Sequence, residues 1–183
     1  MTRLKWIYVV PLLVFAGLVG FLVSQNGRDP SVDTFSLLNK PLPAFTLPDL
    51  QHPDQQVSQK QWLGHPYFMN VWATWCNSCA EEHEELRRIA GEGVPIYGVL
   101  YKDQRAAALD YLAQKGNPFA QIINDEVGNF GIDLGVTGAP ETFLIDAQGV
   151  IRFHMDGPVT DAYWQNTLKP RYQALLQAGG KQP

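Results

Sequence analysis

Asn70-Val71-Trp72-Ala73-Thr74-Trp75-Cys76-Asn77-Ser78-Cys79 is the most informative stretch of this chain of 183 residues. It lies between an apolar run, residues 67–73, and a segment, residues 78–90, in which apolar residues recur at spacings of three and four. The run predicts a buried central strand, and the segment predicts an amphipathic helix. We therefore expect Cys76 at a turn from a strand into a helix.

The rest of the chain alternates between strand-like and helix-like patterns. The expected elements are a strand over 94–101, a helix over 103–115 closed by Gly116, a strand over 119–123, a short helix or turn over 127–134, a hairpin of 142–146 with 150–154, and a helix over 161–168 that Pro170 kinks or restarts. Strands that alternate with helices predict an α/β fold, in which helices cover a central sheet.

The two cysteines stand with two residues between them at the expected start of a helix. Free N–H groups and the dipole at a helix N-terminus lower the pKa of a thiol there, and the thiolate is the form that attacks a disulfide. Cys76 is therefore the expected nucleophile. Cys79, one turn later, is expected to attack the resulting mixed disulfide and release the product. The spacing predicts thiol–disulfide exchange.

Three other interpretations of the cysteine pair remain open. A zinc site normally has four ligands, and the sequence places only His83 near the two thiols. A purely structural disulfide would close a very short loop and would stabilise the fold little. A peroxidatic cysteine would lack its usual surroundings, because Thr74 stands two residues before Cys76 and no proline occupies the expected place upstream.

The N-terminus has the composition of a membrane anchor. Residues 6–23 carry no charge, and Arg3 and Lys5 precede them. A helix of that length would rise about 27 Å, close to the apolar thickness of a bilayer, with the two basic residues in the cytoplasm. We expect an anchor over 1–24 that spans the membrane at about 6–23, a linker over 25–34, a folded domain over 35–178 and a tail over 179–183. The alternative for the first segment is a cleaved signal peptide.

The motif at 70–79, together with Gly135-Val136-Thr137-Gly138-Ala139-Pro140-Glu141-Thr142-Phe143-Leu144-Ile145-Asp146, resembles the CcmG/DsbE family. The resemblance covers nearly the whole chain. It implies a thioredoxin-like α/β fold with a central mixed sheet, flanking helices and an extra β-α insertion, preceded by one N-terminal transmembrane helix. It also implies a periplasmic thiol–disulfide oxidoreductase of the inner membrane. Its disulfide substrates would be the haem-attachment cysteines of apocytochrome c or another cytochrome c maturation protein, and a membrane electron donor would re-reduce it.

The resemblance also implies a set of site residues around a redox-active Cys76–Cys79 disulfide. Pro140 would be a cis-proline against the disulfide, the alternative being a trans proline that opens a strand. Trp75 would form a wall of the site. Glu82 and Glu141 would lie in an acidic substrate groove, where a carboxylate raises the pKa of the nucleophilic thiol and favours the disulfide form. Glu82 also belongs to a run of glutamates, which is the usual pattern of a solvated helix face.

Two residues bear on the redox chemistry in ways that the motif does not settle. Asn77 stands where the family usually has proline, and Asn70 stands where thioredoxins proper have a buried carboxylate. Some other group, such as Glu82 acting through water, would then have to take the proton of Cys79. The sequence lacks a nucleotide-binding glycine signature, so we expect no cofactor, and electrons must come from a partner. We also expect no metal, because the sequence offers only His83 beside the two thiols.

Other functions compete with reduction of apocytochrome c. One is a general periplasmic disulfide oxidant or isomerase. Another, of a different class, is a metal chaperone or binding module that uses the same groove. The formal net charge of -4 and the scattered Lys and Arg argue against nucleic-acid binding.

Overall fold

The computed structural model describes residues 3–25 and 35–179. The chain divides into two compact units, Met1–Thr34 and Phe35–Pro183. Except for Gln25 and Gly179, the linker expected at 25–34 and the tail expected at 179–183 lie outside the described residues.

The first unit contains one helix, α1 (Arg3–Gln25), and the segment expected to cross the membrane lies within it. No helix among the described residues has the combined length and apolar character needed to span a membrane. The transmembrane anchor therefore stays a prediction.

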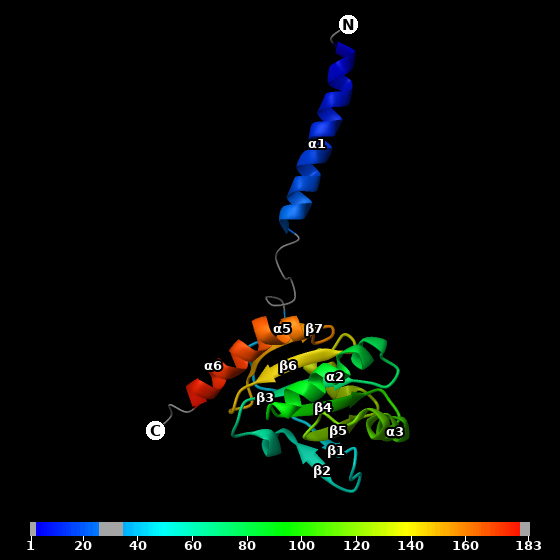
Figure 1. Cartoon of the computed structure of the whole chain (residues 1–183), viewed down its shortest axis with the longest axis vertical. Coiled ribbons are helices and arrows are strands. Elements are labelled where there is room, and N and C mark those ends of the chain that lie inside the picture. Colours follow the sequence, from blue (N-terminus) through cyan, green and yellow to red (C-terminus); the bar gives the residue numbers. More distant parts are fainter. Residues whose placement is uncertain (1–2, 26–34, 180–183) are drawn as a thin grey trace. The chain divides into compact units, whose positions relative to one another are not determined.

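The second unit is built on a mixed sheet of five strands in the order β5-β4-β3-β6-β7 (Figure 1). These strands are β3 (Tyr67–Trp72), β4 (Ile96–Tyr101), β5 (Gln121–Asp125), β6 (Glu141–Ile145) and β7 (Ile151–Asp156). The central strand β3 runs parallel to β4 and antiparallel to β6. All six residues of β3 are buried, which explains its nearly continuous apolar sequence.

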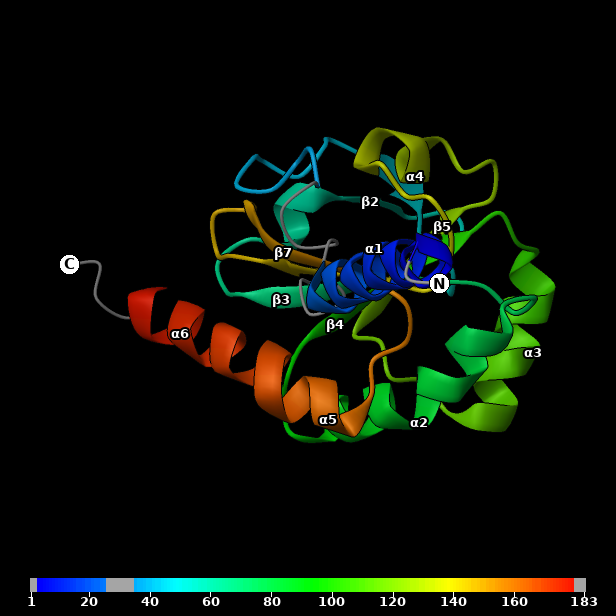
Figure 2. The same ribbon diagram turned by 90° about the horizontal axis from the view of Figure 1, so that it is seen from above.

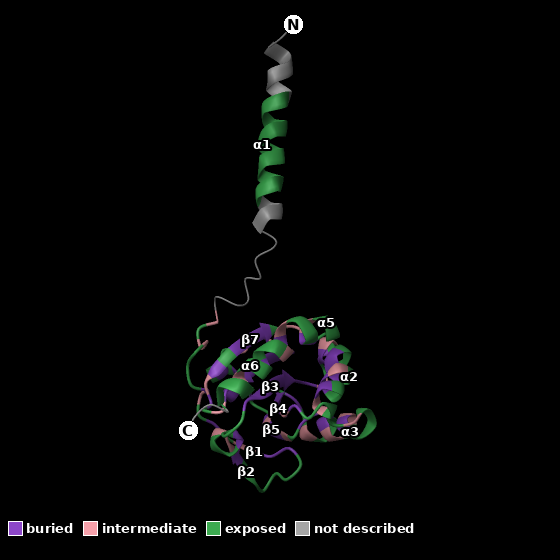
Figure 3. Ribbon diagram, turned by 60° about the vertical axis from the view of Figure 1, so that its left-hand side comes forward, coloured by how far each residue is buried: buried purple, intermediate pink, exposed green. Residues whose placement is uncertain are grey.

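Helices cover both faces of this sheet (Figure 2). They are α2 (Asn77–Gly91), α3 (Arg105–Lys115), α4 (Asn129–Leu134), α5 (Asp161–Tyr163) and α6 (Lys169–Gly179). On one face, Phe68 of β3 packs against Trp164 and Tyr172, which lie beyond β7. On the other, Met69 and Val71 belong to a core that includes Phe130 of α4 and Trp62. Figure 3 shows the resulting layers, with buried strands and helices exposed on their outer sides.

Most of the predicted elements are present, with shifted ends. The helix expected from 103 begins at Arg105, and the strand expected at 119–123 occupies Gln121–Asp125. Gly116 closes α3 as expected, at a φ of 83°. Ahead of Pro170 the chain forms a π-helical turn, Trp164–Leu168, before α6 resumes. Proline has no N–H for the helical ladder, so the irregularity lies next to it.

The segment before β3 has structure that the sequence patterns did not predict. It contains β1 (Thr46–Pro48) and β2 (Gln56–Ser58), which pair with each other, and a 3₁₀ helix, η1 (Gln59–Trp62). Trp62 of η1 is fully buried and stacks on Tyr97 of β4, with ring centroids 4.4 Å apart. This segment completes the core on the α4 side of the sheet.

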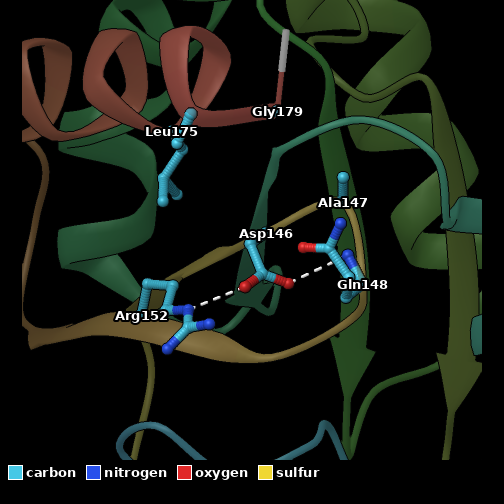
Figure 4. A pocket seen from close by; sticks show the side chains of 7 residues that line it. Asp146, Ala147, Gln148, Arg152, Leu175 and Gly179 are labelled. Carbon is cyan, nitrogen blue, oxygen red and sulfur yellow. Dashed lines mark hydrogen bonds and ion pairs between the residues drawn. The ribbon is translucent and has the colours of Figure 1, made fainter. Parts of the chain in front are cut away.

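A hollow of about 190 Å³ lies where the turn after β6 faces the end of α6 (Figure 4). Arg152 donates a hydrogen bond from Nε to Asp146 Oδ2 at 2.7 Å there, beside Leu175. Pro140 precedes the opposite end of β6, so this hollow is separate from the cysteine site described next.

Candidate active site

Cys76 and Cys79 form a disulfide at the N-terminus of α2, with their Cα atoms 5.3 Å apart. Cys76 is the N-cap of that helix, and its Sγ accepts a hydrogen bond from the Cys79 backbone N–H at 3.1 Å. The helix N-terminus therefore provides a donor at the sulfur expected to carry the thiolate. In this oxidised state the two cysteines are similarly buried, 6% and 5% exposed, so exposure does not distinguish the nucleophile.

The loop before β6 forms the opposite side of the disulfide. The Ala139–Pro140 peptide bond is cis, in agreement with the resemblance. The Ala139 carbonyl oxygen lies 3.2 Å from Cys76 Sγ. A hollow of about 230 Å³ adjoins this loop, and its lining comprises Ser78, residues 137–141, Asp156, Gly157 and Pro158. An extended substrate chain would thus find backbone groups next to the reactive sulfur.

The end of β4 holds the turn that leads to Cys76. Trp75 is 55% exposed, and its indole Nε1–H donates to the Lys102 carbonyl oxygen at 3.1 Å. Asp103 Oδ2 accepts a hydrogen bond from the Thr74 backbone N–H at 2.6 Å. Trp75 is therefore placed as a rim beside the disulfide. The anchoring by Lys102 and Asp103 was not predicted, because only the parallel pairing of β3 and β4 brings these loops together.

Glu82 lies on the buried side of α2, 1% exposed, and is absent from the lining of the hollow beside Pro140. Its Oε1 accepts from Asn70 Nδ2 at 2.8 Å, and its Oε2 accepts from the Val159 N–H at 2.7 Å. Burial raises the pKa of Glu82 to about 7, although these two hydrogen bonds oppose the rise. The glutamate thus exchanges a proton near neutral pH, which is what a proton acceptor for a buried thiol requires.

Asn70 connects Glu82 to the sheet. Its Nδ2 also donates to Thr142 Oγ1 on β6, at 3.0 Å. Within the described part of the chain, the buried Asn70 Oδ1 has no hydrogen-bond partner. Glu82 on α2 therefore supplies a buried carboxyl group that is hydrogen-bonded to the Asn70 amide on β3.

The raised pKa of Glu82 predicts a pH-dependent stability cost. Below the unfolded pKa, near 4.5, the Glu82 carboxyl is protonated in both the folded and the unfolded protein and does not affect the free energy of unfolding. As the pH rises from 4.5 to about 7, the unfolded protein ionises this group more readily than the folded protein, so the folded state loses stability. Glu82→Gln should therefore stabilise the oxidised protein at pH 8 by up to about 3 kcal/mol and give little change at pH 4. Urea unfolding at both pH values measures this. Glu81→Gln, an exposed neighbour on the same helix, is the control; equal effects of the two variants would contradict the assignment.

Glu141 is also buried, 2% exposed, directly after Pro140. Its Oε1 accepts from the Thr137 and Gly138 N–H groups at 2.7 and 3.0 Å, and its Oε2 lies 2.9 Å from His154 Nε2. Burial alone would raise the pKa of Glu141, but the hydrogen bonds from His154, Thr137 and Gly138 outweigh it and hold the pKa below its ordinary value. This carboxylate therefore stays ionised near neutral pH and faces the loop as well as the groove.

His83 and the cysteines do not assemble a zinc site. Its Nε2 lies 2.9 Å from the Gly116 carbonyl oxygen, and its ring packs edge-on against Tyr111. Burial lowers the pKa of His83. In the described residues, the potential metal ligands that come within reach of one another are Glu141, His154 and Asp156.

The chain is similar to known proteins over most of its length. The Redoxin family model matches residues 37–167. A thiol:disulfide interchange protein DsbE of Pseudomonas fluorescens biotype C is 46% identical over 94% of this chain and 96% of its own length. The protein of that name from Escherichia coli K12 is 38% identical over 91% of this chain and 94% of its own.

The fold is also found in solved structures. A putative thiol:disulfide interchange protein DsbE from Chlorobium tepidum superposes with a TM-score of 0.66 at 23% identity, covering 76% of this chain and 97% of the other. A secreted thiol-disulfide isomerase from Corynebacterium glutamicum gives a TM-score of 0.63 at 22% identity, covering 76% and 86%. These likenesses establish a thioredoxin-like fold.

Proposed function

Because this chain belongs to the DsbE (CcmG) family of thiol–disulfide oxidoreductases, we propose that it reduces the disulfide of apocytochrome c haem-attachment cysteines outside the cytoplasm. The observation that carries the proposal is the Cys76–Cys79 disulfide at the start of α2, facing the Ala139–Pro140 loop. Haem-attachment sites have the sequence Cys-x-x-Cys-His, so the substrate is itself a close pair of cysteines.

The proposed reaction begins from the dithiol. The Cys76 thiolate attacks one substrate sulfur, which breaks the substrate disulfide, forms a mixed disulfide and releases one substrate thiolate. Glu82 accepts the proton of Cys79, directly or through water. The Cys79 thiolate then attacks Cys76 Sγ, which closes the protein disulfide and releases the second substrate thiolate. Two electrons pass to the substrate, and a membrane electron donor returns two to the protein.

The proposed compartment rests on the N-terminal sequence. Residues 6–23 are uncharged and follow two basic residues, the pattern of an inner-membrane anchor with the domain at 35–178 on the periplasmic side. An anchored domain would meet both its membrane electron donor and secreted cytochromes. Alkaline extraction of membranes containing the full chain tests the anchor; release into the soluble fraction would contradict it.

A redox titration and a peptide assay test the proposed reaction. The reduced protein should reduce a synthetic Cys-x-x-Cys-His peptide disulfide, and its equilibrium potential should lie well below that of strong oxidants, about −120 mV. A potential near that value would instead favour the alternative function as a general disulfide oxidant. Failure to reduce the peptide would contradict the proposed reductase function. Metal analysis of the reduced protein tests the alternative function as a metal chaperone. One tightly bound zinc or copper ion would favour that alternative.

A further inference from the structure

His154 lies on β7 and pairs with Phe143 of β6, the strand that follows the loop facing the cysteines. Its side chain is 6% exposed, and its ring packs against both Phe35 and Phe143, at centroid distances of 4.2 and 4.6 Å. The ring is therefore held in one position by apolar contacts. Its Nε2 lies 2.9 Å from Glu141 Oε2 and 3.4 Å from Asp156 Oδ1.

Glu141 connects His154 to the loop before Pro140 through hydrogen bonds. One carboxylate oxygen faces His154, while the other accepts hydrogen bonds from the Thr137 N–H, the Thr137 hydroxyl and the Gly138 N–H. The same loop continues to the Ala139 carbonyl oxygen beside Cys76 Sγ and lines the hollow next to it. The backbone of the loop on the substrate side is thus hydrogen-bonded to the buried Glu141 carboxylate, and that carboxylate is in turn hydrogen-bonded to His154.

The carboxylates around His154 show why its imidazole N–H donor matters. The ligand atoms of Glu141, His154 and Asp156 all lie within 4.8 Å of one another. Without the imidazole N–H, two carboxylates would face each other across this gap, one of them buried. Like charges at this separation oppose ionisation, and a neutral carboxyl group is a weaker acceptor for the loop N–H groups.

We propose that His154 is a positioning residue which, through Glu141, fixes the loop of residues 137–140 against which the substrate chain docks. The inference rests on the proposed function, because it concerns how the substrate binds. His154 contacts neither sulfur, so it acts on substrate affinity and leaves the redox properties of the cysteine pair unchanged.

Steady-state reduction of the Cys-x-x-Cys-His peptide by the full chain tests this proposal. His154→Phe keeps a flat ring but removes the donor, and should raise KM about tenfold, the effect of one charge-assisted hydrogen bond, with kcat nearly unchanged. His154→Gln restores an N–H donor and should recover most of the affinity. Met155→Leu, a buried change next to it on β7, is the control and should leave KM unchanged.

Two further measurements separate positioning from loss of structure. Thr137→Val removes the hydroxyl bond to Glu141 at an exposed position and should raise KM two- to threefold even if His154→Phe folds poorly. The equilibrium potential of each variant should match that of the parent protein. The proposal is overturned if Thr137→Val and His154→Phe both have the KM of the parent protein. A shifted equilibrium potential of the cysteine pair in these variants overturns it as well. Failure of the unmodified protein to reduce the peptide would instead overturn the proposed function.

Discussion

Replacing Cys79 with alanine is expected to stop turnover and leave the protein covalently joined to its substrate through Cys76. Attack by Cys76 needs only its own thiolate, which the start of α2 stabilises. The second step needs another thiol of the same chain, and the sequence has only two cysteines. The mixed disulfide should therefore accumulate in a one-to-one complex, which non-reducing electrophoresis and mass spectrometry detect with the Cys-x-x-Cys-His peptide.

Cys76→Ala and Ser78→Ala are the matched variants for this experiment. Cys76→Ala should give neither turnover nor adduct, whereas Ser78→Ala, between the two cysteines, should turn over without accumulating an adduct. Both cysteines are nearly equally buried in the disulfide, so the experiment assigns roles that exposure leaves open. An adduct on Cys79 in the Cys76→Ala protein would reverse the two roles.

Replacing Glu82 with glutamine should slow the resolution of the mixed disulfide by about a hundredfold at pH 7, the low end of what general-base catalysis contributes. Glutamine keeps an acceptor for the Val159 N–H but cannot take a proton from Cys79. In the parent protein the rate should rise as pH increases through about 7, because only the ionised Glu82 accepts the proton. In the variant this rise should vanish, leaving the titration of Cys79 itself.

Stopped-flow tryptophan fluorescence, to which Trp75 next to Cys76 contributes, follows this step. Glu81→Gln removes the same charge from the exposed side of α2 and should behave like the parent protein. A rate for Glu82→Gln equal to that of the parent at neutral pH would exclude Glu82 as the acceptor. Together with the expected gain in stability of this variant, a slower rate would mean that the fold tolerates a buried carboxyl group because catalysis uses it.

Elements with a strong pattern could be predicted from the sequence, and elements held by distant contacts could not. The buried run at 67–73 and the amphipathic segment at 78–90 correspond to β3 and α2. The β1–β2 pair has strands of three residues each, too short to show an alternation. Its connecting loop is held by Arg105, whose Nε donates to the Leu50 carbonyl oxygen at 2.7 Å. No local pattern signals such a contact.

The residues around the cysteines divide in the same way. The resemblance named Glu82 and Glu141 as groove carboxylates. Both are buried and hydrogen-bonded to backbone N–H groups; Glu141 lines the hollow beside Pro140, whereas Glu82 does not. Their surroundings depend on Val159 and on His154, more than ten residues away in sequence. A helical run of glutamates does not reveal which member faces the sheet until the helix is packed on it.

By itself, the sequence determined that this protein carries a dithiol at a strand-to-helix turn, because hydrophobic periodicity and the cysteine spacing are local properties. The family motifs added the chemistry expected there. Only the tertiary structure decided the electrostatics of that site, because a pKa depends on burial and on partners that β3, β6 and β7 bring from distant parts of the chain. Asn70, Glu82, Glu141 and His154 acquire their environments only when those strands pair and α2 covers them.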